Sequence, residues 1–200
     1  MSSQRKLKTI KHYHEPGDLH ELTFSCYRRI ALLTNNAWRE KLSRSIDDAC
    51  EAERCLLVAF VYMPEHVHLL LWPQTNEPRI DLVLKRLKRP VSILARDVLR
   101  ASRSRLLQRL IVRERPDKVV FRFWQEGPGY DRNLQTCEAV QASIDYIHNN
   151  PVVRGLCRRA RDWRWSSARF YESRGKLHDP AWPRLTFLPN EFWTSQAVVS

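Results

Sequence analysis

Two histidines separated by a single residue stand at the start of a strongly apolar segment. His66 and His68 flank a valine, and residues 69–72 continue the segment as Leu-Leu-Leu-Trp. In a β-strand, side chains two residues apart point to the same face, so both imidazoles could bind one metal ion. The same spacing also occurs where histidines only form hydrogen bonds at a sheet edge. His12 and His14 share it, but we interpret that pair as non-functional because no strand pattern surrounds it.

A second pair of chemically capable residues stands near the end of a predicted helix. Tyr146 and Asn150 are four residues apart, so they share one helix face. A tyrosine hydroxyl can attack phosphorus and form a phosphotyrosine, but it needs activation because its unperturbed pKa is about 10. The amide oxygen of an asparagine can bind a metal ion. A partly buried tyrosine, and an asparagine that ends a helix before Pro151, would leave the same pattern.

The two pairs together describe a more specific site than either does alone. Two histidine nitrogens and one amide oxygen would supply three protein ligands for Mg²⁺ or Mn²⁺ and leave positions open for a substrate oxygen and water. Such a cation would act as a Lewis acid on a scissile phosphate and orient it for Tyr146. Glu65 directly precedes the histidines. It could accept a proton or only shape the turn, and we favour the turn.

Positive charge is concentrated in two blocks, which indicates a polyanionic partner. The 200 residues include 34 Lys and Arg against 22 Asp and Glu, a formal net charge of +12. Residues 79–115 hold 12 basic and 3 acidic residues, and residues 152–174 hold 7 and 2. Seven Trp, seven Phe and six Tyr add surfaces on which unpaired bases can stack. The densest basic cluster, which we expect to bind DNA, consists of Lys85, Arg86, Lys88 and Arg89.

Composition narrows the classes of protein that remain. Apolar residues make up 43%, which excludes a disordered chain, and only five glycines argue against a Gly-rich nucleotide loop. No apolar run approaches the roughly 18 residues of a membrane span, and residues 1–11 lack the apolar core of a secretory signal. The five cysteines are odd in number and include no C-x-x-C pair, so we expect reduced thiols in a cytosolic protein.

The elements that must position the candidate residues follow a definite order. Apolar or alternating segments and amphipathic helices are expected in the order strand, helix, strand, strand, helix, strand, and a further helix follows. The first six elements match the split βαββαβ pattern, which predicts an α+β, ferredoxin-like fold with an antiparallel sheet and helices on one face. The expected strands are residues 22–27, 55–63, 66–72 and 119–124, and the expected helices are residues 36–49, 80–110 and 136–150.

Prolines and a change of composition set the expected boundaries. We expect Pro90 to split or kink the second helix and Pro151 to end the last one, because proline removes a backbone hydrogen bond and restricts the preceding residue. Residues 1–174 are expected to form a single domain. Residues 175–200 have no clear periodicity and are expected to form a C-terminal extension, docked or mobile.

Four motifs make the chain similar to a known family. In order, they are MPEHVHLLLWP, FWQEGPGYDRN, IDYIHNNPVVRGL and DWRWSSAR. Their order and spacing over about residues 13–171 resemble the REP-associated tyrosine transposases, which belong to the single-tyrosine, HUH-type transposases of bacterial insertion sequences. The resemblance implies an HUH endonuclease-type fold, and the tail from about residue 175 lies outside it.

The resemblance also implies a role for each candidate residue. His66 and His68 match the two histidines of the HUH motif, Tyr146 matches the nucleophile, and Asn150 falls where the family places an amide metal ligand. Enzymes of this family cut single-stranded DNA beside a short imperfect hairpin, form a 5′-phosphotyrosine link, release a 3′-hydroxyl and can reseal the strand. Tyr130 also matches a family position, but it has no ligand partner one turn away, so we prefer Tyr146 as the nucleophile.

The expected protein is therefore a transposase and site-specific single-stranded DNA endonuclease that uses Mg²⁺ or Mn²⁺ and no nucleotide cofactor. Its expected partner is single-stranded DNA with a REP-like hairpin, and no membrane. We expect a monomer or homodimer in the bacterial cytoplasm, at the nucleoid when DNA is bound. Two alternatives stay open. One is a transposase-derived protein that binds hairpin DNA or RNA without cutting, and the other is a replication-initiator or relaxase-type nickase.

Overall fold

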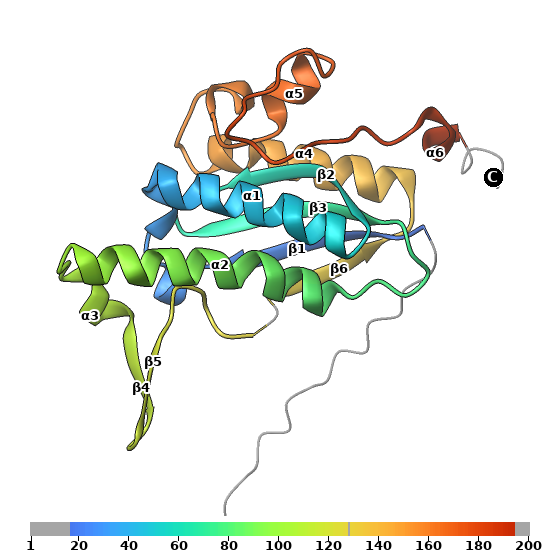
Figure 1. Cartoon of the computed structure of the whole chain (residues 1–200). Coiled ribbons are helices and arrows are strands. Elements are labelled where there is room, and N and C mark those ends of the chain that lie inside the picture. Colours follow the sequence, from blue (N-terminus) through green and yellow to red (C-terminus); the bar gives the residue numbers. More distant parts are fainter. Residues whose placement is uncertain (1–16, 128, 195–200) are drawn as a thin grey trace, which may run out of the picture.

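A four-stranded antiparallel sheet is the centre of this computed structural model, which describes residues 17–127 and 129–194. The pair His12 and His14 lies outside the described residues. β3 and β1 are the central strands, and β2 and β6 are the edges (Figure 1). In spatial order the strands are β2 (Cys55–Tyr62), β3 (His66–Pro73), β1 (Leu19–Ser25) and β6 (Tyr130–Leu134). The predicted α+β class and antiparallel sheet are confirmed.

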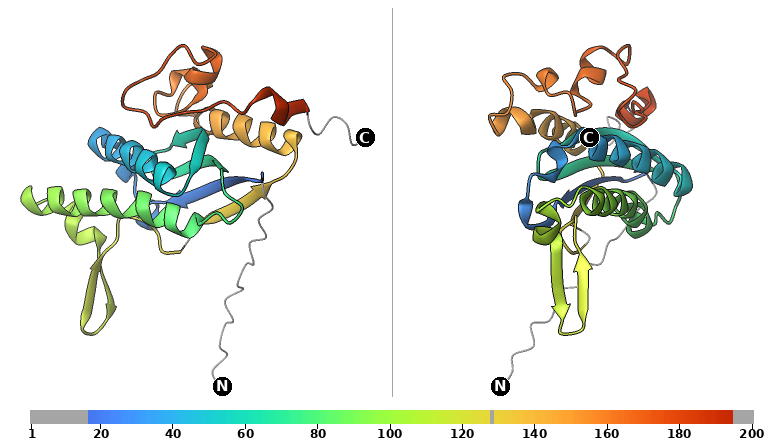
Figure 2. Two further views of the ribbon diagram at one scale, coloured as in Figure 1. Left: turned by 45° about the vertical axis from the view of Figure 1, so that its right-hand side comes forward. Right: turned by 60° about the vertical axis from the view of Figure 1, so that its left-hand side comes forward.

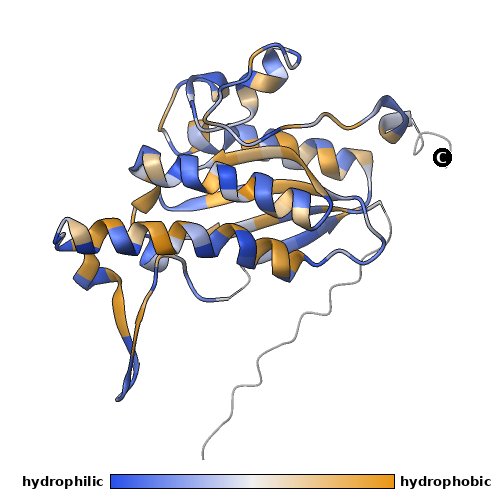
Figure 3. Cartoon of the chain, in the orientation of Figure 1, coloured by the Kyte–Doolittle hydropathy of each residue, from blue (hydrophilic) through white to orange (hydrophobic). Residues whose placement is uncertain are grey.

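Two long helices, α1 (Asn36–Ala52) and α2 (Ile80–Ala101), cover one face of this sheet. The side-chain oxygen of Asn35 accepts a hydrogen bond from the backbone N–H of Trp38, which makes Asn35 the N-cap of α1. Alternate residues of the strands, such as Val67, pack against apolar stripes of both helices and form the larger core. Figure 3 shows apolar residues along the strands and as bands on both helices.

α4 (Cys137–Val153) lies on the opposite face, and within the sheet it contacts mainly β2 and β3. Its buried residues form a second core with the strand residues that point away from α1 and α2. This core includes Val58, Val61, Leu70, Val140, Ile144 and Ile147. The expectation of helices on one face therefore holds for α1 and α2 but is wrong for α4. The strand interiors are apolar on both faces, and this alone already requires a cover on each.

The fourth strand of the sheet is not the segment that its hydrophobic pattern suggested. The expected strand at residues 119–124 falls on β5 (Lys118–Phe121), which pairs with β4 (Ile111–Arg115) in a separate arm that projects from the body (Figure 2). β6 takes the fourth place with the polar sequence YDRNL. An edge strand with one largely uncovered face carries little apolar alternation, so its pattern was not detectable.

Both prolines expected to interrupt helices lie inside them. α2 runs through Pro90, and a separate short helix, α3 (Leu106–Leu110), follows it. Pro151 lies in the last turn of α4 and is itself buried. A proline inside a helix costs one backbone hydrogen bond. Buried residues on either side of Pro90, Leu87 and Val91, hold α2 against the core and offset that cost.

The segment after residue 174 is docked on the body. Trp182 is buried against Phe60 of β2, and the backbone N–H of Thr186 donates to the carbonyl of Leu57 at 3.0 Å. The other short elements are the 3-10 helices η1 (Tyr27–Arg29), η2 (Leu32–Thr34) and η3 (Ala160–Asp162) and the helices α5 (Ala168–Glu172) and α6 (Asn190–Thr194).

The chemical state of the thiols follows from their burial. Cys26 and Cys55 take part in no disulfide, and burial raises the pKa of Cys26 to about 12 and that of Cys55 to about 11. Both thiols therefore stay protonated at neutral pH. In the part of the chain that the structure describes, no helix is both long and apolar enough to cross a bilayer.

Candidate active site

The two imidazoles of the His-x-His pair lie side by side on the α4 face of β3. His66 and His68 are buried, and their ring centroids are 4.8 Å apart. Val67 between them packs into the core on the other face, beneath α1 and α2. The two-residue period of the strand thus places both rings on one side, where they line a common hollow.

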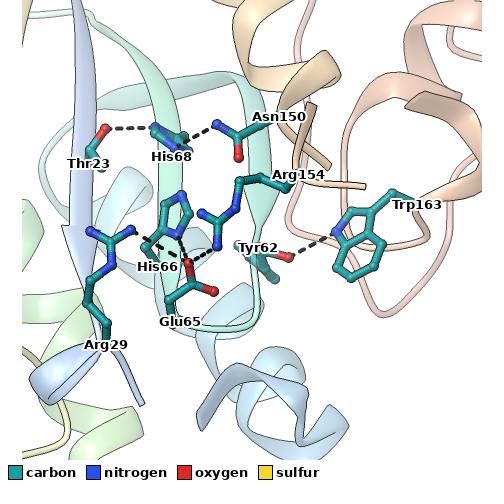
Figure 4. Close-up of polar contacts among 9 residues, drawn as sticks. All are labelled: Thr23, Arg29, Tyr62, Glu65, His66, His68, Asn150, Arg154 and Trp163. Atoms are coloured by element: carbon teal, nitrogen blue, oxygen red, sulfur yellow. Dashed lines mark hydrogen bonds and ion pairs between the residues drawn. The ribbon is translucent and has the colours of Figure 1, made fainter. Parts of the chain in front are cut away.

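Hydrogen bonds determine which nitrogen of each ring is available. Nδ1 of His66 donates to Oε1 of Glu65 at 3.1 Å, because a carboxylate only accepts (Figure 4). Nδ1 of His68 lies 2.7 Å from Oγ1 of Thr23 on β1. Burial, with smaller contributions from His66 and Arg29, lowers the pKa of His68 to about 3, so this ring is neutral. Nε2 of each histidine is the nitrogen left for a ligand.

Asn150 reaches this pair from the end of α4. Its Nδ2 lies 3.3 Å from Nε2 of His68, and its buried Oδ1 has no hydrogen-bond partner among the described residues. A buried carbonyl oxygen without a partner is costly, and a cation would satisfy it. Two imidazole nitrogens and an amide oxygen fit a divalent cation. The described residues contain no cluster of three His, Cys, Asp or Glu side chains, so a metal site here would depend on Asn150.

Tyr146 lies one helical turn before Asn150 on α4 and is half exposed. Its ring stands edge-on to that of His68, with centroids 5.3 Å apart and an interplanar angle of 88°. The other candidate tyrosine, Tyr130 on β6, is also exposed and borders a neighbouring hollow that His68 and Tyr146 line as well. Of the two, Tyr146 is the one in ring contact with the histidine pair.

Two adjoining hollows meet at His68 and Tyr146, so these side chains are accessible from two sides. The first has a volume of about 530 Å³ and extends over β1 and β6. The second has a volume of about 350 Å³ and is bordered by the histidine pair, η1 and the end of α4. The side chains that border both hollows are Thr23, His68 and Tyr146.

Two arginines that the sequence patterns did not indicate border the second hollow. Arg154 at the end of α4 lies 2.9 Å from Oε1 of Glu65, and Arg29 lies 3.6 Å from the same oxygen (Figure 4). Burial alone would raise the pKa of Glu65, but His66 and Arg154 outweigh it and hold that pKa below its usual range. The carboxylate is therefore ionised and holds both guanidinium groups beside the histidine pair.

Comparison with known families gives a match over the first half of the chain. Residues 18–114 match the family model described as "Transposase IS200 like". This part of the chain belongs to the IS200-like transposase family. The matched range contains His66 and His68 and ends before α4, which carries Tyr146 and Asn150.

One solved structure shares the fold over most of the chain. A structure described as the REP-associated tyrosine transposase bound to a REP hairpin has a TM-score of 0.63 and 18% sequence identity, over 90% of this chain and 99% of that chain. A putative transposase from Deinococcus radiodurans has a TM-score of 0.42 and 18% identity, over 75% of this chain and 98% of that chain. No curated protein sequence matches the chain.

The DWRWSSAR motif, residues 162–169, connects α4 to the sheet through hydrogen bonds. Oγ of Ser167 lies 2.8 Å from Nε2 of His148 on α4 and also bonds both backbone polar groups of Phe60 on β2, at 3.0 and 3.2 Å. Nε1 of Trp163 donates to the carbonyl of Tyr62 at 3.0 Å (Figure 4). The bond to Ser167 holds α4 against the sheet at His148, two residues after Tyr146. The motif therefore helps to position the candidate site without bordering it.

The basic cluster of α2 lies on the opposite face of the sheet from the candidate site, and its members differ in their surroundings. Arg86 pairs with Glu53 of α1 at 2.6 Å. The Lys88 ammonium lies over the ring of Phe24, 4.7 Å from its centroid, and burial lowers the pKa of Lys88 to about 8. Lys85 and Arg89 are exposed and border a shallow hollow with Arg86. Within the described residues, neither of these two side chains forms an ion pair.

Proposed function

We propose that this IS200-like transposase is a metal-dependent enzyme that cuts and rejoins single-stranded DNA beside hairpin, REP-like repeats. The main support for the proposal is that two elements, β3 and α4, bring a candidate nucleophile and three candidate metal ligands into contact. His66 and His68 come from β3, and Tyr146 and Asn150 come from α4. A protein that binds DNA without cutting it does not need a tyrosine beside a set of metal ligands.

The metal ligands we propose are Nε2 of His66, Nε2 of His68 and Oδ1 of Asn150. The partnerless Oδ1 of Asn150 and the contacts that occupy Nδ1 of both histidines support this set. A bound Mg²⁺ or Mn²⁺ would supply Lewis-acid polarisation of the scissile phosphate. All three side chains and Tyr146 belong to one chain, which favours a monomer as the active unit.

Tyr146 is the proposed nucleophile of a transesterification. Its hydroxyl loses a proton and forms a bond to phosphorus, while the bond from phosphorus to the 3′ oxygen breaks and that oxygen gains a proton. The product is a 5′-phosphotyrosine and a free 3′-hydroxyl, which can attack in reverse to reseal the strand. One phosphodiester replaces another, so no nucleotide cofactor is consumed. The half-exposed position of Tyr146 leaves its hydroxyl accessible to DNA.

The partners of Glu65 favour a positioning role over a role as proton acceptor. Its carboxylate holds His66, Arg154 and Arg29, and its pKa lies below the usual range. A carboxylate with a lowered pKa is a weak base. We therefore assign Glu65 to orienting His66 and the two arginines, of which Arg154 would face the phosphates flanking the cut.

The DNA partner we propose is a single strand that carries a hairpin. The similar REP-associated transposase was solved with a REP hairpin, and the net charge of +12 suits a polyanion in this chain as well. We assign the hairpin stem to the exposed basic face of α2, chiefly Lys85 and Arg89. Phe24 of β1 touches α2 through Lys88, so this helix lies along the β1 side of the sheet. We propose that the protein acts in the bacterial cytoplasm, at the nucleoid.

A denaturing gel with end-labelled hairpin oligonucleotides tests the proposed reaction. The wild-type protein and Tyr146→Phe are incubated with the DNA in Mn²⁺, in Mg²⁺ and in EDTA. A slowly migrating protein–DNA adduct is expected only for the wild type and only with metal. A native gel of the same samples reports binding separately. Binding by both proteins without any adduct would contradict the proposal and favour a protein that binds hairpins without cutting them.

A further inference from the structure

The first hollow, over β1 and β6, extends well beyond the histidine pair. α4 makes its main contacts with β2 and β3, so residues of β1 and β6 on the same face border an open space. In the register of these strands, Thr23 is opposite Tyr130 and Glu21 is opposite Arg132. All four side chains border the hollow, in two adjacent rows.

We propose that this hollow binds one unpaired base of single-stranded DNA next to the scissile phosphate, and that it prefers guanine, through Tyr130, Glu21 and Arg132. The inference rests on the proposed function for the identity of the strand. It adds a specificity site, which no part of the proposed cleavage reaction requires.

Tyr130 supplies the stacking surface. Its side chain is 54% exposed on an edge strand and borders the hollow, so its ring is accessible to a base. Tyr130 is opposite Thr23 of β1, and Thr23 bonds His68 of β3. Only β1 therefore separates the strand of Tyr130 from the strand that carries the histidine pair. Bases stack on exposed aromatic rings in proteins that bind single strands.

Glu21 and Arg132 supply the groups that read the base edge. Glu21 is nearly buried and offers only acceptors, whereas Arg132 is exposed and forms no ion pair within the described residues. The Watson–Crick edge of guanine presents two adjacent N–H donors beside one carbonyl acceptor. A carboxylate next to a guanidinium complements that edge, whereas thymine, with one donor between two carbonyls, would place a carbonyl oxygen against the carboxylate.

Ser143 gives an independent sign that a polar ligand enters here. Its Oγ is buried, the residue is 5% exposed, and no described residue forms a hydrogen bond with this oxygen. Ser143 borders the hollow from α4, one turn before Tyr146. Buried hydroxyls are normally paired, so a partner from the ligand or its bound water is expected.

Binding to Tyr146→Phe, in which cleavage is absent by design, tests the inference. The probes are fluorescein-labelled hairpin oligonucleotides whose single-stranded flanks are dT, with one dG moved through the flank positions. Anisotropy is expected to show one position at which dG tightens binding by about 5- to 150-fold. Adding Glu21→Gln should remove this preference, and the matched control Glu138→Gln, on the exposed first turn of α4, should keep it.

Tyr130 is tested in the same assay. Tyr130→Ala should weaken binding of every probe by about 5- to 150-fold, because stacking is lost whatever the base. Tyr130→Phe retains the ring and should bind like its parent. Circular dichroism melting of each variant shows that it is folded.

The outcomes separate this inference from the proposed reaction. Equal binding at all dG positions, or a preference that survives Glu21→Gln, would overturn the guanine site even where the wild type forms the adduct. A dG preference that depends on Glu21 in a protein that forms no adduct would support the base site and contradict the proposed cleavage.

Discussion

The side-chain nitrogen of Asn150 lies 3.3 Å from Nε2 of His68, while the oxygen of the same amide has no hydrogen-bond partner among the described residues. A half-turn of the amide would bring that oxygen to the imidazole lone pair. Two lone pairs at one point repel each other unless a cation lies between them. The contact therefore has two arrangements, an N–H donor when no metal is bound and an oxygen ligand when a cation lies between the two atoms.

Metal binding should stabilise the fold through Asn150. A ligand at about 100 times its Kd adds about 2.7 kcal/mol to the stability of the folded state, so Mn²⁺ should raise the Tm of the wild type by several degrees. Asn150→Ala should lose most of this rise, and Asn149→Ala, at the exposed neighbouring position, should keep it. Differential scanning fluorimetry with and without EDTA measures both. An equal Mn²⁺ response in Asn150→Ala would remove Asn150 from the ligand set.

Thr23 should matter for activity although it is not a ligand. Its hydroxyl is the partner of Nδ1 of His68, and partners of this kind are worth about 10- to 100-fold in metal affinity or activity. Thr23→Val keeps the shape of the side chain but should lower the cleavage rate by that factor and raise the Mn²⁺ concentration needed. Thr23→Ser should restore much of the rate. Wild-type rates in Thr23→Val at limiting metal would refute this role.

Gly129 should be required where Gly127 is not. Both have positive φ, +86° and +99°, but a Cβ on Gly129 would meet the carbonyl oxygen of Thr23 at 2.1 Å, and one on Gly127 would meet nothing within 4 Å. Gly127→Ala should lower the free energy of unfolding by only about 1–2 kcal/mol, the cost of a left-handed backbone for alanine. Gly129→Ala should cost more and should also displace Thr23 from His68. Urea unfolding of the two variants makes the comparison, and equal losses would show that the contact has no energetic weight.

Binding to hairpin DNA should fall steeply with salt. Lys85→Ala and Arg89→Ala should each reduce the slope of log K against log salt by about 1, because each removes one phosphate contact. Arg86→Ala is the internal comparison, since Arg86 is held by Glu53 and should change the slope less. Anisotropy titrations between 50 and 200 mM salt give the slopes. A larger change for Arg86→Ala would mean that the ion pair opens on DNA.

The parts of the fold with a local pattern were predictable from the sequence. The amphipathic stripe and Asn35 cap of α1 and the apolar run of β2 each lie within one segment, and the structure has both elements close to the expected bounds. β6 was not predictable, because most of its side chains are not buried and its YDRNL sequence has no apolar alternation. The arm of β4 and β5 was missed since alternation reports a strand but not its partner.

The candidate site divides in the same way. The spacings of His66 with His68 and of Tyr146 with Asn150 each place two side chains on one face of a single element. Thr23 meets His68 across 45 residues, and Ser167 meets Phe60 across 107 residues, so no local spacing could reveal either contact. Arg154 is an intermediate case, because it is the C-cap of α4, four residues beyond Asn150, and this helix was expected to end at Pro151.

The position of the covalent bond tests the central claim most directly. Wild-type protein is incubated with a hairpin oligonucleotide and Mn²⁺, trapped in denaturant and digested with nuclease and trypsin, and the adduct is located by tandem mass spectrometry. The account predicts a nucleotide-phosphate group on the Tyr146 peptide, and none in EDTA. The same group on Tyr130, which borders the same hollow, would contradict the assignment of the nucleophile, and an unmodified protein with intact binding would contradict the reaction itself.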